Sequence, residues 1–214
     1  MEWKKEFIEF LLKKKVLNFG KFILKSGRVS PYFFNSGLLS TGQDTAIIGS
    51  FYARAIMDLN IEFDMLFGPA YKGIPIVVST SIALKNQYNL NIPYSFNRKE
   101  EKKYGEQGTL IGKNVKNKNI IILDDVITSG ISINHSIQII EKEKSKISAI
   151  FVLLDRKEKR NINLNNIHHE KKYKTHKINS IITIDDLIFY LLKQKKLKKY
   201  AFKLIKYYKE YGNS

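Results

Sequence analysis

The stretch Asn119-Ile-Ile-Ile-Leu-Asp-Asp-Val-Ile-Thr-Ser-Gly-Ile-Ser-Ile133 decides how this chain is expected to fold. Its apolar run, Ile120 to Leu123, is mostly β-branched and has no polar break, which predicts a strand buried on both faces. Asp124 and Asp125 end the run, and a short turn then leads into a helical pattern. A strand, a turn and a helix N-terminus form a natural anion site, because the free backbone N–H groups and the helix dipole point at the ligand.

The acidic pair distinguishes this stretch from a P-loop, whose lysine lies inside G-x-x-x-x-G-K-[ST], because no lysine is present here. Aspartates accept hydrogen bonds from ribose hydroxyls and support a magnesium ion through water. A phosphorylated sugar such as ribose 5-phosphate therefore suits the stretch. The alternative is an ordinary parallel strand that ends in a helix-capping aspartate. The apolar run, the sequence D-D-V-I-T-S-G and the following helix together favour the ligand site.

This stretch resembles the phosphoribosyl pyrophosphate (PRPP) motif of type I phosphoribosyltransferases. The resemblance implies that Asp124 and Asp125 hold the ribose hydroxyls and that Thr128, Ser129 and Gly130 grip the 5′-phosphate. It implies PRPP contact for the whole run of Asp124, Asp125, Val126, Ile127, Thr128, Ser129, Gly130, Ile131 and Ser132.

Composition favours one globular α/β chain. The 214 residues suffice for a sizeable core, and there is no cysteine for disulfides or thiolate chemistry. The N-terminus lacks the apolar segment of a signal peptide, and no apolar run is long enough to span a bilayer, so we expect a cytoplasmic protein. Lys and Arg total 37 against 20 Asp and Glu, a net charge of +17. This charge fits nucleic acid, a membrane surface or a polyanionic substrate. Because the lysines are spread along the chain, we favour general lysine over-use and expect neither nucleic acid nor membrane as a partner.

The segment from Asn18 to Gly37 predicts a hairpin, because Ser26-Gly27-Arg28 is a turn signal between two apolar stretches. It resembles the N-terminal signature of bacterial and fungal orotate phosphoribosyltransferases. In that family the residues matching Lys25, Phe33 and Phe34 line the orotate pocket. A basic group suits a carboxylated pyrimidine, and an aromatic ring stacks on it.

A second strand, turn and helix occurs at Phe63 to Pro75, where Gly68-Pro-Ala-Tyr-Lys-Gly-Ile-Pro75 contains a lysine in the turn. One interpretation is a routine connection between a strand and a helix. The other is an anion loop for the pyrophosphate group of PRPP. The segment resembles the family's pyrophosphate loop, which implies PRPP contacts for Tyr71 and Lys72.

The polar segment 97–109 follows an expected strand at Ile92 to Phe96 and predicts a mobile surface loop. It resembles the family's catalytic loop, whose pattern is roughly R-K-x-x-K-x-H-G. Arg98, Lys99 and Lys102 match this pattern and are implied to contact PRPP. Tyr104 stands at the position of the family's histidine; a tyrosine donates a hydrogen bond to phosphate but carries no positive charge.

Arg156 follows directly after Asp155, at the end of an expected strand from Lys146 to Leu154. The resemblance implies that Arg156 contacts orotate, and it implies the same for Thr128. An arginine at a strand end is well placed to pair with a carboxylate. A salt bridge to Asp155 or its neighbours is the open alternative.

Alternating strands and helices predict an α/β fold with a mainly parallel sheet flanked by helices. The resemblance implies the type I phosphoribosyltransferase fold over residues 1–214 as a single domain, with a small hood formed by about residues 1–40 and part of the C-terminal region. It implies a homodimer that converts orotate and PRPP to orotidine 5′-phosphate and pyrophosphate. The implied catalytic residues are Lys72, Arg98, Lys99, Lys102, Asp124 and Asp125. Mg²⁺ is expected to be carried by PRPP without direct protein ligation, reached through water by Asp124 and Asp125.

Two alternatives stay open at this point. A purine phosphoribosyltransferase is disfavoured by the segment with Lys25, Phe33 and Phe34. A PRPP-sensing regulator that binds nucleic acid is disfavoured because the chain has no room for a DNA-binding module.

Overall fold

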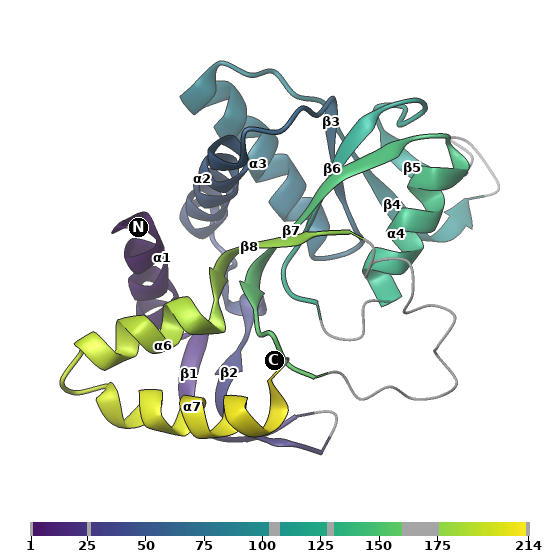
Figure 1. Cartoon of the computed structure of the whole chain (residues 1–214). Helices are drawn as coiled ribbons and strands as arrows, with labels where there is room; N and C mark the ends of the chain where they lie inside the picture. The colour runs from purple at the N-terminus through teal and green to yellow at the C-terminus, as the bar shows by residue number, and fades with distance from the viewer. Residues whose placement is uncertain (1, 25–26, 103–107, 128–130, 160–175, 213–214) are drawn as a thin grey trace. The chain divides into compact units, whose positions relative to one another are not determined.

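The structure is a computed structural model that describes residues 2–24, 27–102, 108–127, 131–159 and 176–212, without the side chains of Glu101, Lys102 and Ile131 (Figure 1). The chain divides into two compact units. The first contains Met1–Ser40, Leu154–Asn161 and Ile182–Ser214, and the second contains Thr41–Leu153 and Ile162–Ile181. The expectation of one domain with a hood stays a prediction.

A six-stranded sheet has the strand order β5-β4-β3-β6-β7-β8. β3 pairs in parallel with β4 and β6, β6 pairs in parallel with β7, and β4 and β5 are antiparallel. The mainly parallel sheet predicted from the sequence is therefore confirmed. The strands are β3 (Met65–Gly68), β4 (Tyr94–Lys102), β5 (Gly108–Gly112), β6 (Asn119–Asp124), β7 (Lys146–Asp155) and β8 (Ile178–Thr183).

Helices cover both faces of this sheet in the second unit. Alternate residues of a strand point to opposite faces. Ile120 and Ile122 of β6 pack in one cluster with Ile133 and Ile137 of helix α4 (Ile131–Lys142). Ile121, between them in β6, is also fully buried, which makes β6 a strand covered on both sides. Helix α3 (Gly73–Tyr88) packs against β3, β4 and β6, and α2 (Gly42–Leu59) packs against α3 (Figure 1).

Helix α2 begins with a reciprocal cap formed by Thr41 and Asp44. Thr41 accepts a hydrogen bond from the Asp44 N–H group, and the Asp44 carboxylate accepts one from the Thr41 N–H group. This reciprocal capping satisfies backbone donors that the first helical turn leaves free. The start of the helix is thus determined locally.

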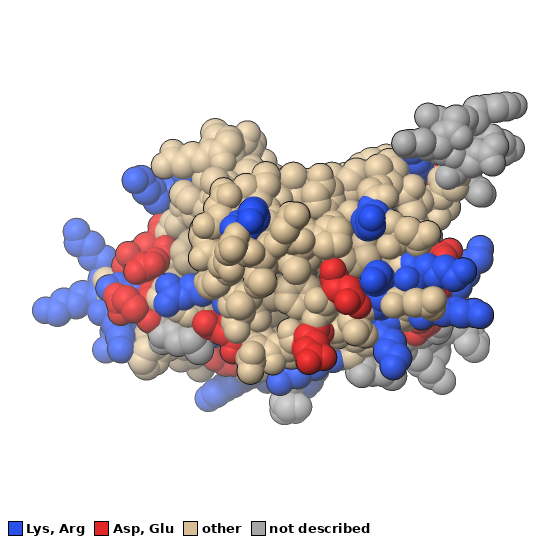
Figure 2. Space-filling view, turned by 90° about the horizontal axis from the view of Figure 1, so that it is seen from above, with Lys and Arg blue, Asp and Glu red and all other residues tan. Residues whose placement is uncertain are grey.

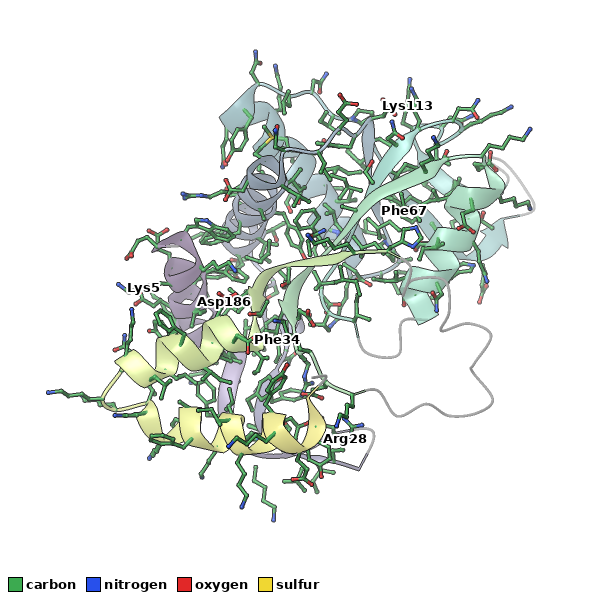
Figure 3. All side chains as sticks on the ribbon, in the orientation of Figure 1. Lys5, Arg28, Phe34, Phe67, Lys113 and Asp186 are labelled. Carbon is green, nitrogen blue, oxygen red and sulfur yellow. The ribbon has the colours of Figure 1, made fainter. Side chains whose placement is uncertain are left out.

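The first unit contains α1 (Glu2–Lys13), the antiparallel strands β1 (Leu17–Ile23) and β2 (Val29–Phe34), a short 3₁₀ turn η1 (Ser36–Leu38), α6 (Ile184–Lys193) and α7 (Lys198–Tyr211). The hairpin predicted for the N-terminal segment is confirmed. Lys4 of α1 and Asp186 of α6 form an ion pair of 2.7 Å, and Asp186 is labelled in Figure 3.

Strand β4 is longer than the sequence predicts. We expected a loop from Asn97 onward, but β4 continues to Lys102 and pairs with β5 through Asn97–Leu110 and Lys102–Gly108. The reason is that ladder hydrogen bonds use backbone groups only. A charged segment without apolar alternation therefore still forms a strand when a partner strand lies beside it. Residues 103–107 lie outside the described residues.

Acidic side chains lie among the basic ones on the face of the molecule drawn in Figure 2. Over the part of the chain that the structure describes, we find no helix with both the length and the apolar character needed to cross a bilayer.

Candidate functional site

The carboxyl end of β6 presents two buried carboxylates. Asp124 and Asp125 are 7% and 6% exposed. The Asp125 N–H group donates to Asp124 Oδ1 at 2.9 Å, and the Val126 N–H group donates to Asp125 Oδ1 at 2.8 Å. Burial, and then the neighbouring Asp125 charge, raise the pKa of Asp124 to about 7. Full ionisation of this pair is therefore unfavourable, and a ligand with hydroxyl donors or a cation would stabilise the ionised form.

Tyr52 of α2 is hydrogen-bonded to the carboxyl end of β6. Its side chain is fully buried, and its hydroxyl donates a 2.6 Å hydrogen bond to the carbonyl oxygen of Asp124. Burial, followed by the charges of Asp124 and Asp125, raises the pKa of this hydroxyl well above its ordinary value. Tyr52 therefore remains a neutral donor that fixes the backbone of the acidic pair.

Lys72 connects the loop after β3 to the acidic pair. Its Nζ atom lies 2.9 Å from Asp125 Oδ2, and its side chain is 57% exposed. The two carboxylates and the lysine thus lie together at the carboxyl ends of the neighbouring strands β3 and β6, the edge at which parallel sheets bind ligands.

Glycines permit the loop to approach β6 this closely. A Cβ atom on Gly73 would lie 2.8 Å from the carbonyl oxygen of Leu123, and one on Gly68 would lie 2.3 Å from the carbonyl oxygen of Gly73. Both distances are far below normal contacts. The sequence pattern of glycines around Lys72 is therefore a packing requirement of the loop.

The same loop is attached to β4. The Ala70 N–H group donates to Asn97 Oδ1 at 3.0 Å, and the Ala70–Tyr71 peptide is cis. Lys99 Nζ lies 4.5 Å from the centre of the Tyr71 ring, and Tyr71 is 66% exposed. A lysine and a tyrosine at an open loop suit a polyanionic ligand, and the cation–π contact holds both near the loop.

The structure thus brings together Lys72, Asp124 and Asp125, and separately Lys99 with Tyr71. Arg98 is half-buried in β4. Val126 and Ile127 follow the acidic pair, and Ile127 packs against the core cluster around α4. Ser132 is exposed in the first turn of α4. Several predicted residues lie outside the described part of the chain: Lys25, Tyr104, Thr128, Ser129 and Gly130, together with the side chains of Lys102 and Ile131.

Three of the residues expected to bind the pyrimidine, Phe33, Phe34 and Arg156, belong to the first unit. Phe33 is 39% exposed and stacks on Phe22 at 5.5 Å between ring centroids. Phe34, which is labelled in Figure 3, is half-buried. Because Phe33 and Phe34 are neighbours in strand β2, their side chains point to opposite faces. Arg156 forms an ion pair with Glu158, 2.8 Å between Nη2 and Oε1. This pair corresponds to the salt-bridge alternative, and contact of Arg156 with orotate stays a prediction.

Sequence reasoning missed three polar partners. Tyr52 lies in the buried stripe of α2, Asn97 is 5% exposed at the point where the loop was expected, and Glu158 lies in a polar segment. Their roles depend on residues distant in sequence. The one available signal was Tyr52, a hydroxyl-bearing ring in an otherwise apolar helix stripe.

Among the residues that the structure describes, no three His, Cys, Asp or Glu side chains gather as a metal site. Asp124 and Asp125 are two buried carboxylates of the oxygen-ligand type that Mg²⁺ prefers.

Known proteins resemble the chain over its full length. Residues 38–186 match the phosphoribosyl transferase domain family. The chain is 66% identical over 212 residues to the orotate phosphoribosyltransferase of Buchnera aphidicola subsp. Acyrthosiphon pisum (strain Tuc7), covering 99% of this chain and 100% of that protein. It is 47% identical to the enzyme of Photorhabdus laumondii, covering 98% of each. The crystal structure of the Francisella tularensis orotate phosphoribosyltransferase superposes with a TM-score of 0.85 at 36% identity, covering 97% of this chain and 100% of that one.

Proposed function

Because the chain belongs to the orotate phosphoribosyltransferase family, we propose that it transfers the ribose 5-phosphate group of PRPP to orotate. The products are orotidine 5′-phosphate and pyrophosphate, in the synthesis of UMP. The observation that carries this proposal is the 66% identity over 212 residues to a full-length enzyme of that name. The type I phosphoribosyltransferase fold and the acidic pair beside Lys72 support it.

The reaction needs no protein nucleophile. The ring nitrogen N1 of orotate releases its proton to solvent and forms a bond to C1′ while the bond from C1′ to pyrophosphate breaks, and positive charge develops on the sugar. The chain accelerates this exchange by holding the two reactants in line and by stabilising the leaving pyrophosphate.

Lys72 is placed to stabilise the leaving group. Its side chain is 57% exposed, and its Nζ atom lies 2.9 Å from Asp125 Oδ2. When ribose hydroxyls take up the hydrogen bonds of the acidic pair, the ammonium is freed to turn toward the pyrophosphate oxygens. Arg98, Lys99 and Lys102 of β4 supply further positive charge in this proposal, and Tyr71 holds Lys99 near the loop.

The acidic pair is proposed to hold the ribose hydroxyls and, through water, Mg²⁺. The raised pKa of Asp124 fits a pair that gains stabilisation from a nearby cation. When bound, Mg²⁺ would neutralise charge on the pyrophosphate group. We further propose that Thr128, Ser129 and Gly130 grip the 5′-phosphate, that Tyr104 adds a neutral donor, and that Lys25, Phe33, Phe34, Thr128 and Arg156 surround orotate.

The proposal also includes a cytoplasmic homodimer formed by a single catalytic domain, residues 1–214, with the hood as an accessory part. The chain has no cysteine, which is compatible with a reducing compartment such as the cytoplasm. Sedimentation equilibrium of the purified protein gives the oligomeric state, and a mass of one chain would contradict the dimer.

The test of the reaction follows the ultraviolet absorbance of orotate with purified protein, PRPP and Mg²⁺. We expect the orotate signal to fall only when all components are present and to return when pyrophosphate is added to the product. Conversion of a purine base with no change in orotate would keep the PRPP site and overturn the substrate. PRPP binding without any turnover would favour the regulator alternative.

A further inference from the structure

Arg156 is held by a buried cluster in the first unit. Its Nε atom donates to the Tyr32 hydroxyl at 2.8 Å and to Glu158 Oε1 at 2.9 Å, and its guanidinium carbon lies 4.7 Å from the centre of the Tyr32 ring. The side chains of Arg156 and Glu158 are 17% and 14% exposed. Glu158 Oε1 thus faces both the Nε and the Nη2 atoms of the Arg156 guanidinium, at 2.9 and 2.8 Å, which fixes the orientation of its plane.

Glu158 is shared between two arginines. Its Oε2 atom lies 3.9 Å from Arg28 Nη1, while Oε1 faces Arg156. The Tyr32 hydroxyl also donates to Oε1, at 3.2 Å, and Tyr32 is fully buried. Glu158 therefore contacts both arginines and Tyr32 at once, which ties the orientation of its carboxylate to all three side chains.

The end of helix α7 closes over Glu158. Glu158 and Gly212 form an antiparallel bridge, and the Lys159 N–H group donates to the Tyr211 carbonyl oxygen. The Tyr211 ring lies 5.0 Å from the guanidinium carbon of Arg28, and Figure 3 labels Arg28 near this end of α7. Backbone pairing on one side and a ring contact on the other thus fix both Glu158 and its second arginine.

We propose that Glu158, held by the end of α7, is a positioning residue that sets the direction of the Arg156 guanidinium toward the substrate carboxylate. This inference rests on the proposed function, in which Arg156 contacts orotate. A free arginine side chain has many rotamers, and ordering it costs free energy at each binding event. Glu158 and Tyr32 order the Arg156 side chain before the substrate binds. They therefore increase the affinity for orotate and not the affinity for PRPP.

The test compares steady-state kinetics of Glu158→Ala and Glu158→Gln with the wild-type enzyme. We expect Glu158→Ala to raise the KM for orotate about tenfold while kcat and the KM for PRPP stay within about twofold. Glu158→Gln keeps an oxygen that accepts from Arg156 Nε, so its effect is smaller. It also serves as the readable variant if the alanine protein does not fold.

A double variant separates positioning from a general structural effect. Because Glu158 acts through Arg156, the pair Arg156→Ala and Glu158→Ala together raises the KM for orotate no further than Arg156→Ala alone. Lys4→Gln is the matched control, since it removes another ion pair of the same unit, Lys4–Asp186, without touching Arg156. We expect its KM for orotate to equal that of the wild type.

Removal of residues 211–214 tests the contribution of α7. We expect a rise in the KM for orotate similar to that of Glu158→Ala, because the bridge at Gly212 and the Tyr211 contact are lost together. A folded Glu158→Ala enzyme with an unchanged or lower KM for orotate would overturn the proposal. If Arg156→Ala itself left that KM unchanged, the assigned contact of Arg156 with orotate would fail too, while orotate turnover by the wild type would still support the proposed reaction.

Discussion

The ammonium of Lys72 lies 2.9 Å from Asp125 Oδ2, so the loop after β3 and the end of β6 are joined by a direct ion pair. The lysine side chain is 57% exposed, whereas the carboxylate is only 8% exposed. An ion pair with one solvated partner contributes little to stability. In the proposed reaction, this contact keeps a cation beside the position where the pyrophosphate charge develops.

Lys72→Ala should lower the rate of orotate consumption by at least about a hundredfold, since it removes a charged donor from the leaving group. Its melting temperature should fall by no more than a few degrees. Initial rates from orotate absorbance and thermal unfolding by circular dichroism give both values. Lys85→Ala is the control, because Lys85 is an exposed lysine of α3 whose ammonium bonds to Asn89, four residues away, among the described residues. Wild-type turnover in Lys72→Ala would refute the assigned role.

Asp124→Asn should change how stability depends on pH. The folded-state pKa of Asp124 is raised to about 7, so the folded protein holds this proton more tightly than the unfolded chain does. The contribution of this bound proton to the free energy of unfolding is fully present below pH of about 4 and is lost as the pH rises toward about 7. The asparagine variant does not lose this stability as the pH rises, because a neutral amide can be buried without binding a proton. It should gain a few degrees in melting temperature over wild type at pH 8 and little or nothing at pH 4.

Melting curves of both proteins between pH 4 and 8 measure this difference. The asparagine side-chain oxygen still accepts from the Asp125 N–H group, so the local backbone is preserved. Equal pH dependence in the two proteins would show that Asp124 titrates at its ordinary pKa. Activity should fall in the variant at every pH, because a neutral amide replaces the carboxylate that we propose holds the ribose hydroxyls.

The fold was largely predictable because its signals are local. The buried run Ile120 to Leu123 lies in strand β6, which is covered on both sides, and residues close together in sequence, Thr41 and Asp44, cap α2. The extension of β4 to Lys102 was not predictable, since it depends on backbone pairing with β5 and leaves no periodic pattern in a charged segment.

The candidate site was predictable in part. Lys72, Asp124 and Asp125 follow strand ends, and parallel neighbours bring such ends together. The supporting contacts were not predictable, because the Tyr52 hydroxyl and the Asn97 amide bond to residues far away in the sequence. Only the packed structure determines which buried polar side chain meets which backbone group.

Gly73→Ala should destabilise the protein by about 2 kcal/mol or more, since overpacking forces the backbone to shift. The added Cβ would lie 2.6 Å from Pro69 Cδ and 2.8 Å from the Leu123 carbonyl oxygen. Gly42→Ala is the matched control, because a Cβ there meets nothing within 4 Å in the first turn of α2. Urea denaturation midpoints measure both. A Gly73→Ala midpoint equal to that of wild type would show that the loop does not pack this closely against β6.

Asn97→Leu should raise the KM for PRPP more than the KM for orotate. The Asn97 side chain is 5% exposed, and its oxygen accepts from the Ala70 N–H group at 3.0 Å, just before Tyr71 and Lys72. Leucine has a similar size but cannot accept a hydrogen bond, so the loop that carries both residues loses its tie to β4. We expect the KM for PRPP to rise about tenfold with a smaller change in the KM for orotate. Asn97→Asp keeps an acceptor oxygen and should retain most of the PRPP affinity. Equal KM values for PRPP in the leucine variant and the wild type would mean that the loop keeps its position without Asn97.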